Sequence, residues 1–575
     1  MMITSGLLGI HIPKIKTLRA VLLLAVALSA GSLSAQGRVF WQEGGVVICD
    51  STWAAVEQAA APDGSGGVVV VWPDTRGDHE SVWAQRVDCD GNPVWQPDGV
   101  FLRGGAWSPR QFSAVSDGTG GLIAVWQEEF AGPYVHQVTA QRVDASAAVR
   151  WGASGVVVTG SDLGRVYEVA AVSDGRGGAV VAWVVAPDSA VDSLVVQRLD
   201  SLGHPCWSTP GLVVATESVG TGPPVMCPDG AGGVCMAWSF TGSYVWRAVA
   251  QHIDSTGHTT WPGAGVSLFT SSCGHADATP LTGGYVIAGR IVDSIRAQRV
   301  DAEGQVLWGP NGCPVYSGAS GGILGQVRVL PGLDGASYVV WCENRTGICG
   351  EHAQLLSASG QRLWDSLGVE VGSTNYNEAY YFGAVSGGRG GLIVSWPTLS
   401  GGTSGWDIYA QRLDSAGRLL WGTPGLGVAT DSGRQSDEPS VVTDERQGAI
   451  IAWGNSYAGQ RVGVNVQRVG DAVALNDLGS SAIRARSVAV RPSPATDFVR
   501  IDIPGDVRSL AVMDATGRLV RTLDRVASFG STSRFAWDLR TGRGGEVAPG
   551  VYFCQNPRST RCLASIVVAC HKVGL

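Results

Sequence analysis

The chain has 575 residues, of which 81 are glycine and 16% are charged, and its formal net charge is −8. Tryptophan (21) outnumbers phenylalanine (11) in a turn-rich, aromatic-rich composition that is typical of β-structure and excludes a coiled coil. The 45% hydrophobic content excludes wholesale disorder, and the absence of a basic patch excludes nucleic acid as an expected partner.

Residues 1–35 are predicted to form a secretory signal peptide. Lys14, Lys16 and Arg19 precede the apolar run 20–28, which small residues follow. The alternative, a membrane anchor, is disfavoured because this run is too short to cross about 30 Å of hydrocarbon. No later stretch is apolar for long enough either, so we expect an exported mature chain without a transmembrane segment.

The twelve cysteines all follow the predicted signal, and export permits disulfides. Three pairs fall across expected hairpins: Cys227 and Cys235, Cys342 and Cys349, and Cys554 and Cys562. Each pair is a candidate disulfide, although spacing alone does not establish bridge geometry. There is no CxxC motif and no Cys/His cluster with zinc spacing, so we interpret the cysteines as structural and expect no metal site.

One sequence unit recurs eight times between the predicted signal and residue 472. A glycine turn leads into an apolar run that ends in Trp72, Trp126, Trp183, Trp238, Trp341, Trp396 or Trp453, with Gly289 in the tryptophan place of a shorter fifth copy. A second motif of the form AQRVD carries Gln85, Gln141, Gln197, Gln251, Gln298, Gln354, Gln411 and Gln467. A third motif, D-x-x-G-x-x-x-W, closes most copies.

These units predict an all-β fold, an eight-bladed β-propeller over residues 36–472. The run before each tryptophan is apolar on both faces, as expected of a strand that lies between two neighbouring blades. The eighth unit lacks its last strand, and the segment 40–47 resembles that missing piece, so an N-terminal strand is expected to close the ring. Seven blades plus an irregular insert is the alternative, because the fifth unit is weak.

A short linker, residues 473–486, leads to a segment with different patterning at 487–575. Short runs at 498–503, 508–513, 519–524, 533–538, 550–555 and 563–569 are separated by Gly, Pro and Asp turns. This spacing predicts a small β-sandwich of immunoglobulin-like size.

This segment also resembles a known family. The sequences RPSPATDFVRIDIP, LAVMDATGRLVRTL and WDLRTGRGGEVAPGVYF are similar to the C-terminal Ig-like domain shared by flagellar hook-capping proteins and the type IX (Por) secretion sorting domain. The resemblance covers roughly residues 487–570; RPSP stands where family members usually have NP. It implies a bacterial protein, secreted or held at the cell surface in association with the outer membrane, whose C-terminal domain engages the secretion machinery. The repeats resemble those of secreted bacterial proteins with such tails, which implies no particular activity.

Residues that recur in every blade are interpreted as scaffold, because a binding site is used once. Binding is instead expected on the face that carries the second-to-third strand and blade-to-blade connections, where aromatic and charged residues are interspersed. The candidate binding residues are Trp107, Tyr134, Tyr244, Trp246, Arg247, Tyr376, Glu378, Trp406 and Asp407. The alternative reading of this face is an ordinary solvated rim.

The favoured function is a non-catalytic propeller that binds a polysaccharide or a surface protein. The chain has no G-x-S-x-G elbow, zinc motif or phosphate loop, so no catalytic residue is assigned. One alternative is a glycan hydrolase that uses loop carboxylates, for example Glu128 with Glu343 or Glu378. The D-x-x-G-x-x-x-W motif resembles the docking repeats of quinoprotein dehydrogenases, but the vicinal cysteines of those enzymes are absent, so no cofactor is expected. A purely structural surface protein is the remaining alternative.

Overall fold

The computed structural model divides the chain into two compact units, residues 1–472 and 473–575. In the first unit it describes residues 37–49, 57–76, 79–130, 136–159, 165–186, 191–216, 224–242, 245–270, 273–291, 294–318, 323–344, 348–374, 381–388, 390–399, 406–430, 434–457 and 460–471. In the second it describes residues 489–491, 499–504, 509–513, 519–529, 532–541, 547, 550–555 and 562–568. Within these ranges no helix is both long and apolar enough to span a membrane.

The first unit contains eight antiparallel sheets, which follow one another along the chain. Blade 1 is β3 (Ala59–Pro62), β4 (Val68–Asp74), β5 (Ser81–Val87) and β6 (Val100–Gly104). Blade 2 is β7 (Trp107–Ser116), β8 (Leu122–Phe130), β9 (His136–Val143) and β10 (Val156–Val157). Blade 3 is β11 (Arg165–Ser173), β12 (Ala179–Ala186), β13 (Ser193–Leu199) and β14 (Leu212–Thr216). Blade 4 is β15 (Val225–Pro228), β16 (Val234–Gly242), β17 (Val245–Ile253) and β18 (Val266–Ser267).

The second half of the ring repeats this order of strands. Blade 5 is β19 (Gly274–Leu281), β20 (Gly284–Ile291), β21 (Ser294–Asp301) and β22 (Cys313–Ser317). Blade 6 is β23 (Ile323–Pro331), β24 (Ser337–Asn344), β25 (Cys349–Leu356) and β26 (Val369–Ser373), with the short 3-10 turn η1 (Leu333–Gly335) between β23 and β24. Blade 7 is β27 (Gly383–Ser386), β28 (Leu392–Leu399), β29 (Trp406–Leu413) and β30 (Leu426–Ala429). Blade 8 is β31 (Arg434–Thr443), β32 (Ala449–Tyr457) and β33 (Gln460–Asp471), together with β1 (Gly37–Val39) and β2 (Val46–Cys49) from the N-terminus.

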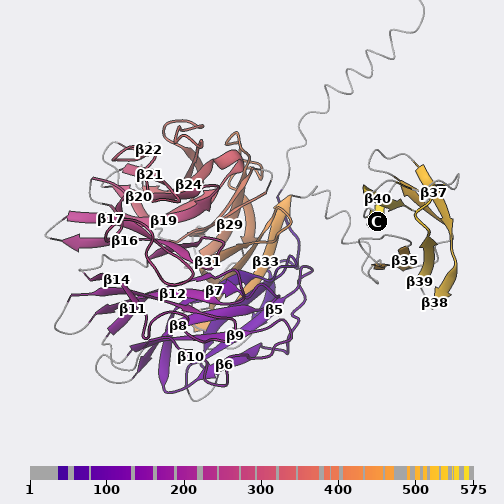
Figure 1. The fold of residues 1–575 in the computed structure, drawn as a ribbon, viewed down its shortest axis with the longest axis horizontal. Coiled ribbons are helices and arrows are strands. Elements are labelled where there is room, and N and C mark those ends of the chain that lie inside the picture. The colour runs from indigo at the N-terminus through magenta and orange to yellow at the C-terminus, as the bar shows by residue number, and fades with distance from the viewer. Residues whose placement is uncertain are drawn as a thin grey trace, which may run out of the picture. The chain divides into compact units, whose positions relative to one another are not determined.

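The eight sheets form a closed ring with the first strand of each blade innermost. Each first strand contacts the first strand of the next blade, and the last of them, β31, contacts β3 of blade 1. Figure 1 shows the same closure, because the orange β33 lies beside the indigo strands of the first blades. The all-β, eight-bladed prediction is therefore confirmed. The seven-blade alternative is wrong, because β19–β22 form a complete sheet.

The ring is closed by the N-terminal segment, as the sequence predicts. β1 and β2 both pair antiparallel with β33, so they supply the outer strand of blade 8. The backbone amide of Trp41 donates to Oε1 of Gln467 at 3.0 Å, and Nε2 of Gln467 donates to the carbonyl of Gln42 at 2.8 Å. These bonds join residues more than 420 positions apart in the chain.

The repeated glutamine makes the same three hydrogen bonds in seven of the eight blades, whereas in blade 4 Nε2 of Gln251 donates to the carbonyls of Trp261 and Gly263 at 3.4 and 3.5 Å. In blade 2, Oε1 of Gln141 accepts from the amides of Arg142 (2.9 Å) and Trp151 (3.1 Å), and Nε2 donates to the carbonyl of Gly152 at 2.7 Å. All eight glutamine side chains are buried. A buried primary amide needs such partners, so the glutamine fixes the turn before strand four against strand three.

The tryptophan of the D-x-x-G-x-x-x-W motif connects neighbouring blades. The indole nitrogen of Trp151 in blade 2 donates to the carbonyl of Ser201 in blade 3 at 3.2 Å, and Trp207 repeats this bond to Ser255 at 3.2 Å. The ring of Trp151 also lies against Gly203, where a Cβ would come within 2.9 Å of it. The glycine of the motif is therefore needed for close approach of the neighbouring tryptophan.

The D-G-x-G-G segments are structural turns. Oδ1 of Asp63 accepts from the amides of Ser65 (2.8 Å) and Gly67 (2.7 Å), and Oδ2 pairs with Arg86 at 2.9 Å. The same pairing joins Asp117 to Arg142, Asp174 to Arg198 and Asp444 to Arg468. In these blades the arginine of AQRVD therefore forms an ion pair within the scaffold, as predicted.

Blade 5 has no core tryptophan, and Phe269 occupies the space that this side chain fills in the other blades. A Cβ at Gly99 or Gly368 would strike Cη2 of the core tryptophan of its blade, at 2.8 and 2.6 Å. At the equivalent Gly312 it would meet Cε1 of Phe269 at 3.0 Å. Phe269, which follows β18, therefore takes the volume left by Gly289 and keeps the interface between blades 4 and 5 filled.

Two of the candidate disulfides fall within the described residues, and neither is formed. Cys227 and Cys235 are direct cross-strand partners in β15 and β16, and their buried thiols hydrogen bond to each other. Cys342 is likewise a thiol that hydrogen bonds to Cys349. The side chains of Cys554 and Cys562 lie outside the described part of the chain.

The second unit contains two four-stranded antiparallel sheets. One has the order β34 (Ala489–Arg491), β35 (Val499–Pro504), β39 (Thr532–Trp537) and β38 (Ala527–Phe529). The other has the order β37 (Leu519–Asp524), β36 (Ser509–Met513), β40 (Gly550–Gln555) and β41 (Cys562–Val568). Each of the six predicted runs coincides with a strand to within one residue. The short β34 and β38 were not predicted from the sequence.

Replacing the closing glutamine, Gln467→Ala, is expected to destabilise the propeller by about 2–5 kcal/mol, because two buried backbone amides lose their acceptor. The measurement is urea unfolding followed by tryptophan fluorescence. Gln141→Ala is the matched control, since it removes the same bonds inside a single blade. Both variants should lose similar stability, but only Gln467→Ala should release residues 37–49 to limited proteolysis. Equal protease resistance of this segment in the two variants would contradict the proposed role in closure.

Candidate functional site

A cavity of about 800 Å³ lies along the axis of the propeller. Most of its lining comes from the innermost strands of blades 2 to 6, with a contribution from the second strands of blades 4 and 5. This volume is in the range of small-ligand sites in proteins. The lining residues are Phe112, Ser113, Val169–Val172, Pro224–Met226, Ala237–Ser239, Ala276, Asp277, Arg290, Gly325–Arg328 and Tyr381.

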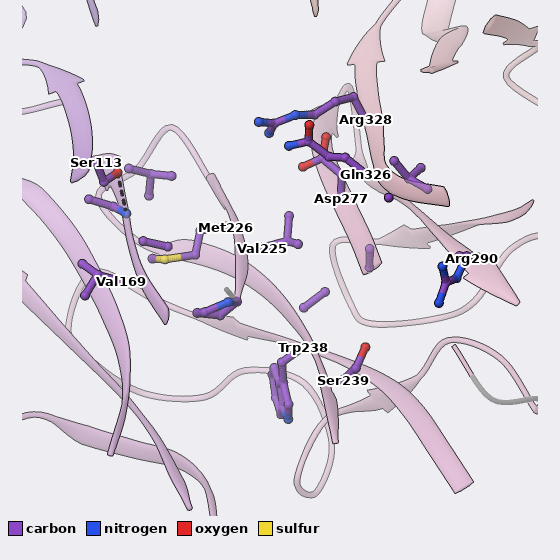
Figure 2. A pocket seen from close by; sticks show the side chains of 18 of the residues that line it. Ser113, Val169, Val225, Met226, Trp238, Ser239, Asp277, Arg290, Gln326 and Arg328 are labelled. Atoms are coloured by element: carbon purple, nitrogen blue, oxygen red, sulfur yellow. Dashed lines mark hydrogen bonds between the residues drawn. The ribbon is translucent and has the colours of Figure 1, made fainter. Parts of the chain in front are cut away.

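Polar side chains gather on one wall of this cavity, on the first strands of blades 5 and 6. With the Gln326 amide oriented so that its oxygen faces donors and its nitrogen faces an acceptor, Oε1 accepts from Nη2 and Nε of Arg328 at 2.9 and 3.1 Å, and Nε2 donates to the carbonyl of Phe382 at 3.2 Å. Oδ2 of Asp277 accepts from the amide of Val329 at 2.7 Å. Figure 2 shows Asp277, Gln326 and Arg328 close together, with Arg290 at a second position on the wall.

This polar wall departs from the repeat. The position that pairs with the residue before the core tryptophan is occupied by Ala59, Ser113, Ala170, Val225, Gly383 and Ser440 in six of the blades. In blades 5 and 6 it is occupied by Asp277 and Arg328. Two adjacent blades therefore carry opposite charges where the other six carry small or aliphatic side chains.

The carboxyl group of Asp277 has a mixed environment. Burial raises its pKa above the ordinary aspartate value, and this effect outweighs the opposing effects of the Arg328 charge and of the backbone amides of Val329 and Ala278. Part of the residue is nevertheless accessible from the cavity. The Asp277 carboxyl group therefore keeps its proton to a higher pH than a surface aspartate does.

The remaining wall is mainly apolar. Val169, Val225 and Met226 lie apart from the charged wall in Figure 2, with Trp238 and Ser239 below them. Phe112 stacks on Trp126, with ring centroids 6.4 Å apart, and Trp238 is buried in the core between blades 3 and 4. Tyr381 is 52% exposed, so among the described lining residues it is the large aromatic side chain with the most accessible ring.

Other polar groups of the innermost strands join blades to one another. Oε2 of Glu57 accepts from the amide of Gln111 at 2.5 Å, and Oε1 of Gln111 accepts from the amide of Val169 at 3.3 Å. Oγ of Ser113 accepts from the amide of Ala171 at 3.1 Å. Gln111 itself has a positive φ of 52° at the register shift between β7 and β8. These groups serve the scaffold.

Among the residues predicted from the loop face, those with described side chains are Trp107, Trp406 and Asp407, and none of these three lines the cavity. Trp107 begins β7, is only 7% exposed, and lies in the core of blades 1 and 2 with the guanidinium of Arg103 5.4 Å from its ring centre. Trp406 and Asp407 begin β29, opposite Leu399 and Thr398. Trp246 and Arg247 lie in β17, opposite Thr241 and Phe240. Tyr134, Tyr244, Tyr376 and Glu378 lie outside the described residues.

Glu128 and Glu343, two of the three carboxylates considered for hydrolysis, are part of the scaffold, and Glu378 lies outside the described residues. Glu128 is buried and pairs with Arg103 at 2.6 Å, and its Oε1 also accepts from the indole nitrogen of Trp126 at 3.1 Å. Glu343 is buried in blade 6 and accepts from Trp341 and from the hydroxyl of Tyr316. Each glutamate therefore joins its own blade to the outer strand of the preceding one, and the pair does not form a shared site.

Glu351 is a buried acid of a different kind. It lies three residues before the repeated glutamine, where the other seven blades carry Val82, Val138, Leu194, Ala248, Ile295, Ile408 and Val464. Neither carboxyl oxygen has a hydrogen-bond partner. Burial, assisted by the charge of Glu370, raises its pKa well above the ordinary glutamate value. A neutral acid thus replaces an aliphatic side chain within blade 6.

The sequence motifs did not predict Asp277, Gln326, Arg328 or Arg290 as site residues. The available signal was their departure from the repeat, since charges at an otherwise small position indicate a role outside the shared scaffold. The aromatic and charged residues that indicated a binding face belong to the predicted connections, whereas these residues lie within strands.

Comparison with known proteins identifies no family for this chain. No protein-family model matches the chain, and no curated protein sequence does. Among solved structures, the chain is similar to the β-propeller domain of the Trilobed protease from Pyrococcus furiosus, with 9% identity, 64% of this chain and 95% of the other covered, and a TM-score of 0.36. An α-L-arabinanase from Penicillium chrysogenum has 14% identity over 61% of this chain and 90% of its own, with a TM-score of 0.32. Sqt1 from Chaetomium thermophilum has 12% identity over 75% of this chain and 100% of its own, with a TM-score of 0.37.

Replacing the buried acid, Glu351→Val, is expected to raise the free energy of unfolding at pH 7 by about 1–3 kcal/mol, because an unpartnered buried carboxyl group is removed. The measurement is urea unfolding between pH 4 and pH 9. In the unsubstituted protein the folded state holds this proton to higher pH than the unfolded state does. Its stability should therefore be highest below the unfolded-state pKa and fall as pH rises towards the folded-state pKa.

Glu351→Val should lose this part of the pH dependence. Glu303→Gln, which replaces an exposed acid in the turn after β21, serves as the control, and it should change stability by less than about 0.5 kcal/mol. A destabilised Glu351→Val protein, or an unchanged pH profile, would show that Glu351 is held by interactions that the fold does not reveal.

Proposed function

We propose that the protein is an exported, non-catalytic binding propeller that holds part of a polysaccharide or protein partner in its axial cavity. The observation that carries this proposal is the charged wall formed by Asp277 and Arg328 on two adjacent blades. The repeated glutamines and the arginines that pair with the turn aspartates are bonded within the scaffold, and the core tryptophans are buried in it. Polar residues that depart from the repeat and line a cavity are instead suited to a ligand.

The cavity favours binding over hydrolysis. Among its described lining residues Asp277 is the one acid, whereas glycoside hydrolysis by the common mechanisms uses two carboxyl groups. Glu128 and Glu343 are engaged between strands of neighbouring blades. We therefore assign no catalytic residue.

Export and surface attachment belong to the same proposal. They are supported by the basic and apolar pattern of residues 1–35 and by the resemblance of residues 487–570 to a secretion sorting domain. In this proposal the propeller binds the partner, and the C-terminal unit engages the secretion machinery. The loop-face residues Trp246, Arg247, Trp406 and Asp407 would then contact parts of a long partner that extend beyond the cavity.

Filling the cavity with Val225→Trp is expected to abolish ligand retention while leaving the fold intact. The experiment incubates the chain from residue 36 onward with immobilised bacterial and plant polysaccharides and with a peptide library, and it scores retention, released reducing ends and cleaved peptide together. Val157→Trp is the matched control, because it places the same ring on the exposed outer strand β10.

Retention by the unsubstituted protein and by Val157→Trp, with a loss of about tenfold or more for Val225→Trp, is the expected result. Equal retention by all three proteins would show that the binding site lies outside the cavity. Release of reducing ends or of cleaved peptide would show that the protein is an enzyme.

A further inference from the structure

From the cavity walls we infer the chemical class of the ligand: a peptide segment that presents a carboxylate beside an aliphatic side chain. This inference rests on the binding function proposed above and narrows it. It follows from two features of the cavity, the orientation of the Arg328 guanidinium and the aliphatic surface of the remaining wall.

Arg328 is oriented by a neighbour on its own strand. Gln326 lies two residues before it, and its Oε1 accepts from Nε and Nη2 of Arg328. This amide occupies the side edge of the guanidinium, while its own Nε2 is held by the carbonyl of Phe382 in the next blade. The end of the guanidinium, formed by Nη1 and the second Nη2 hydrogen, is left for a ligand.

A planar pair of N–H donors with this geometry matches a carboxylate. Arginine binds carboxylates through two parallel N–H···O bonds, and such charge-assisted bonds are stronger than neutral ones. Holding the guanidinium in advance lowers the conformational entropy that is lost on binding. Arg290 adds a second positive charge to the cavity, so the described charged groups that line it are two arginines and Asp277.

Asp277 is an acid on the same wall, and its carboxylate form would repel an anionic ligand. Burial raises the pKa of its carboxyl group above the ordinary aspartate value, so this group repels an anion less than a surface aspartate would. Its Oδ2 already accepts from the amide of Val329, so the side chain is fixed in position. The wall is therefore net positive in either protonation state.

The apolar wall distinguishes a peptide from an acidic sugar. Val169, Val225 and Met226 offer aliphatic surface, which suits a branched aliphatic side chain. Sugars are bound mainly by stacking on accessible aromatic rings and by many polar contacts. Phe112 is stacked on Trp126 and Trp238 is buried between blades, which leaves Tyr381 as the accessible ring among the described lining residues. A carboxylate with an aliphatic neighbour uses both walls.

The test measures binding of fluorescent hexapeptides to the chain from residue 36 onward by fluorescence anisotropy. The first probe is Gly-Ser-Gly-Ser-Leu-Val with a free C-terminal carboxylate, and the second is the same peptide as its amide. A third probe, Gly-Ser-Gly-Asp-Leu-Val amide, moves the carboxylate to a side chain. Trigalacturonate, added as an unlabelled competitor, supplies carboxylates without an aliphatic side chain.

The free acid or the aspartate peptide should bind at least about tenfold more tightly than the amide that lacks a carboxylate. Whichever of the two binds identifies the source of the carboxylate. Arg328→Gln should reduce binding by about tenfold or more, whereas Arg362→Gln, on an exposed turn outside the cavity, should have no effect. Asp277→Asn removes the possible negative charge while an amide oxygen can still accept from Val329, so it should bind the peptide at least as tightly as the unsubstituted protein.

Three results would overturn the inference: equal binding of the acid and both amides, binding unaffected by Arg328→Gln, or weaker binding by a folded Asp277→Asn protein. Binding of trigalacturonate that Arg328→Gln abolishes, with no peptide bound, would reject the peptide but keep a binding function in the cavity. Failure of the proposed function itself would instead appear as equal ligand retention by the Val225→Trp protein, so the two failures are distinguishable.

Discussion

The buried amide of the repeated glutamine is the constraint on which the propeller depends. Each of these side chains lies inside a blade, where it must satisfy both its oxygen and its nitrogen. It does so by bonding strand three to the turn that precedes strand four, so a blade without its fourth strand leaves the amide unsatisfied. Blade 8 meets this requirement through Trp41 and Gln42 of the N-terminal segment. The hydrogen bonds that satisfy the Gln467 amide therefore also close the ring.

Closure of the ring brings the eight first strands to the axis, where the cavity lies. The tryptophans of the D-x-x-G-x-x-x-W motif and the aspartate–arginine pairs of the turns hold the blades in place further out. Residues on the first strands do not make these repeated contacts, so they can differ from blade to blade. Blades 5 and 6 use this freedom, because they place Asp277 and Arg328 at a position where other blades carry small or aliphatic residues. The site is thus a local departure from a strongly repeated scaffold.

The sequence predicts the scaffold far better than the site, for a physical reason. Residues such as Gln141 and Trp151 recur because every blade solves the same packing problem, so the fold, the blade number and the closing strand can all be read from spacing. Phe269 shows the limit of this reading, since a residue of the preceding blade that belongs to none of the three motifs fills the space left at Gly289. The cavity depends on which side chains of different blades converge on the axis. The loop residues that were predicted instead include Trp107, which is buried, and Glu128, which is paired with Arg103.

The central claim is that a ligand carboxylate meets Arg328 inside the propeller. A crystal structure of the chain from residue 36 onward, grown with the free-acid hexapeptide, tests it most directly. The account predicts electron density for a carboxylate within hydrogen-bond distance of Nη1 and Nη2 of Arg328, with the aliphatic side chain against Val225 and Met226. Peptide density confined to the outer strands or to the loop face, with the cavity holding only water, would contradict it.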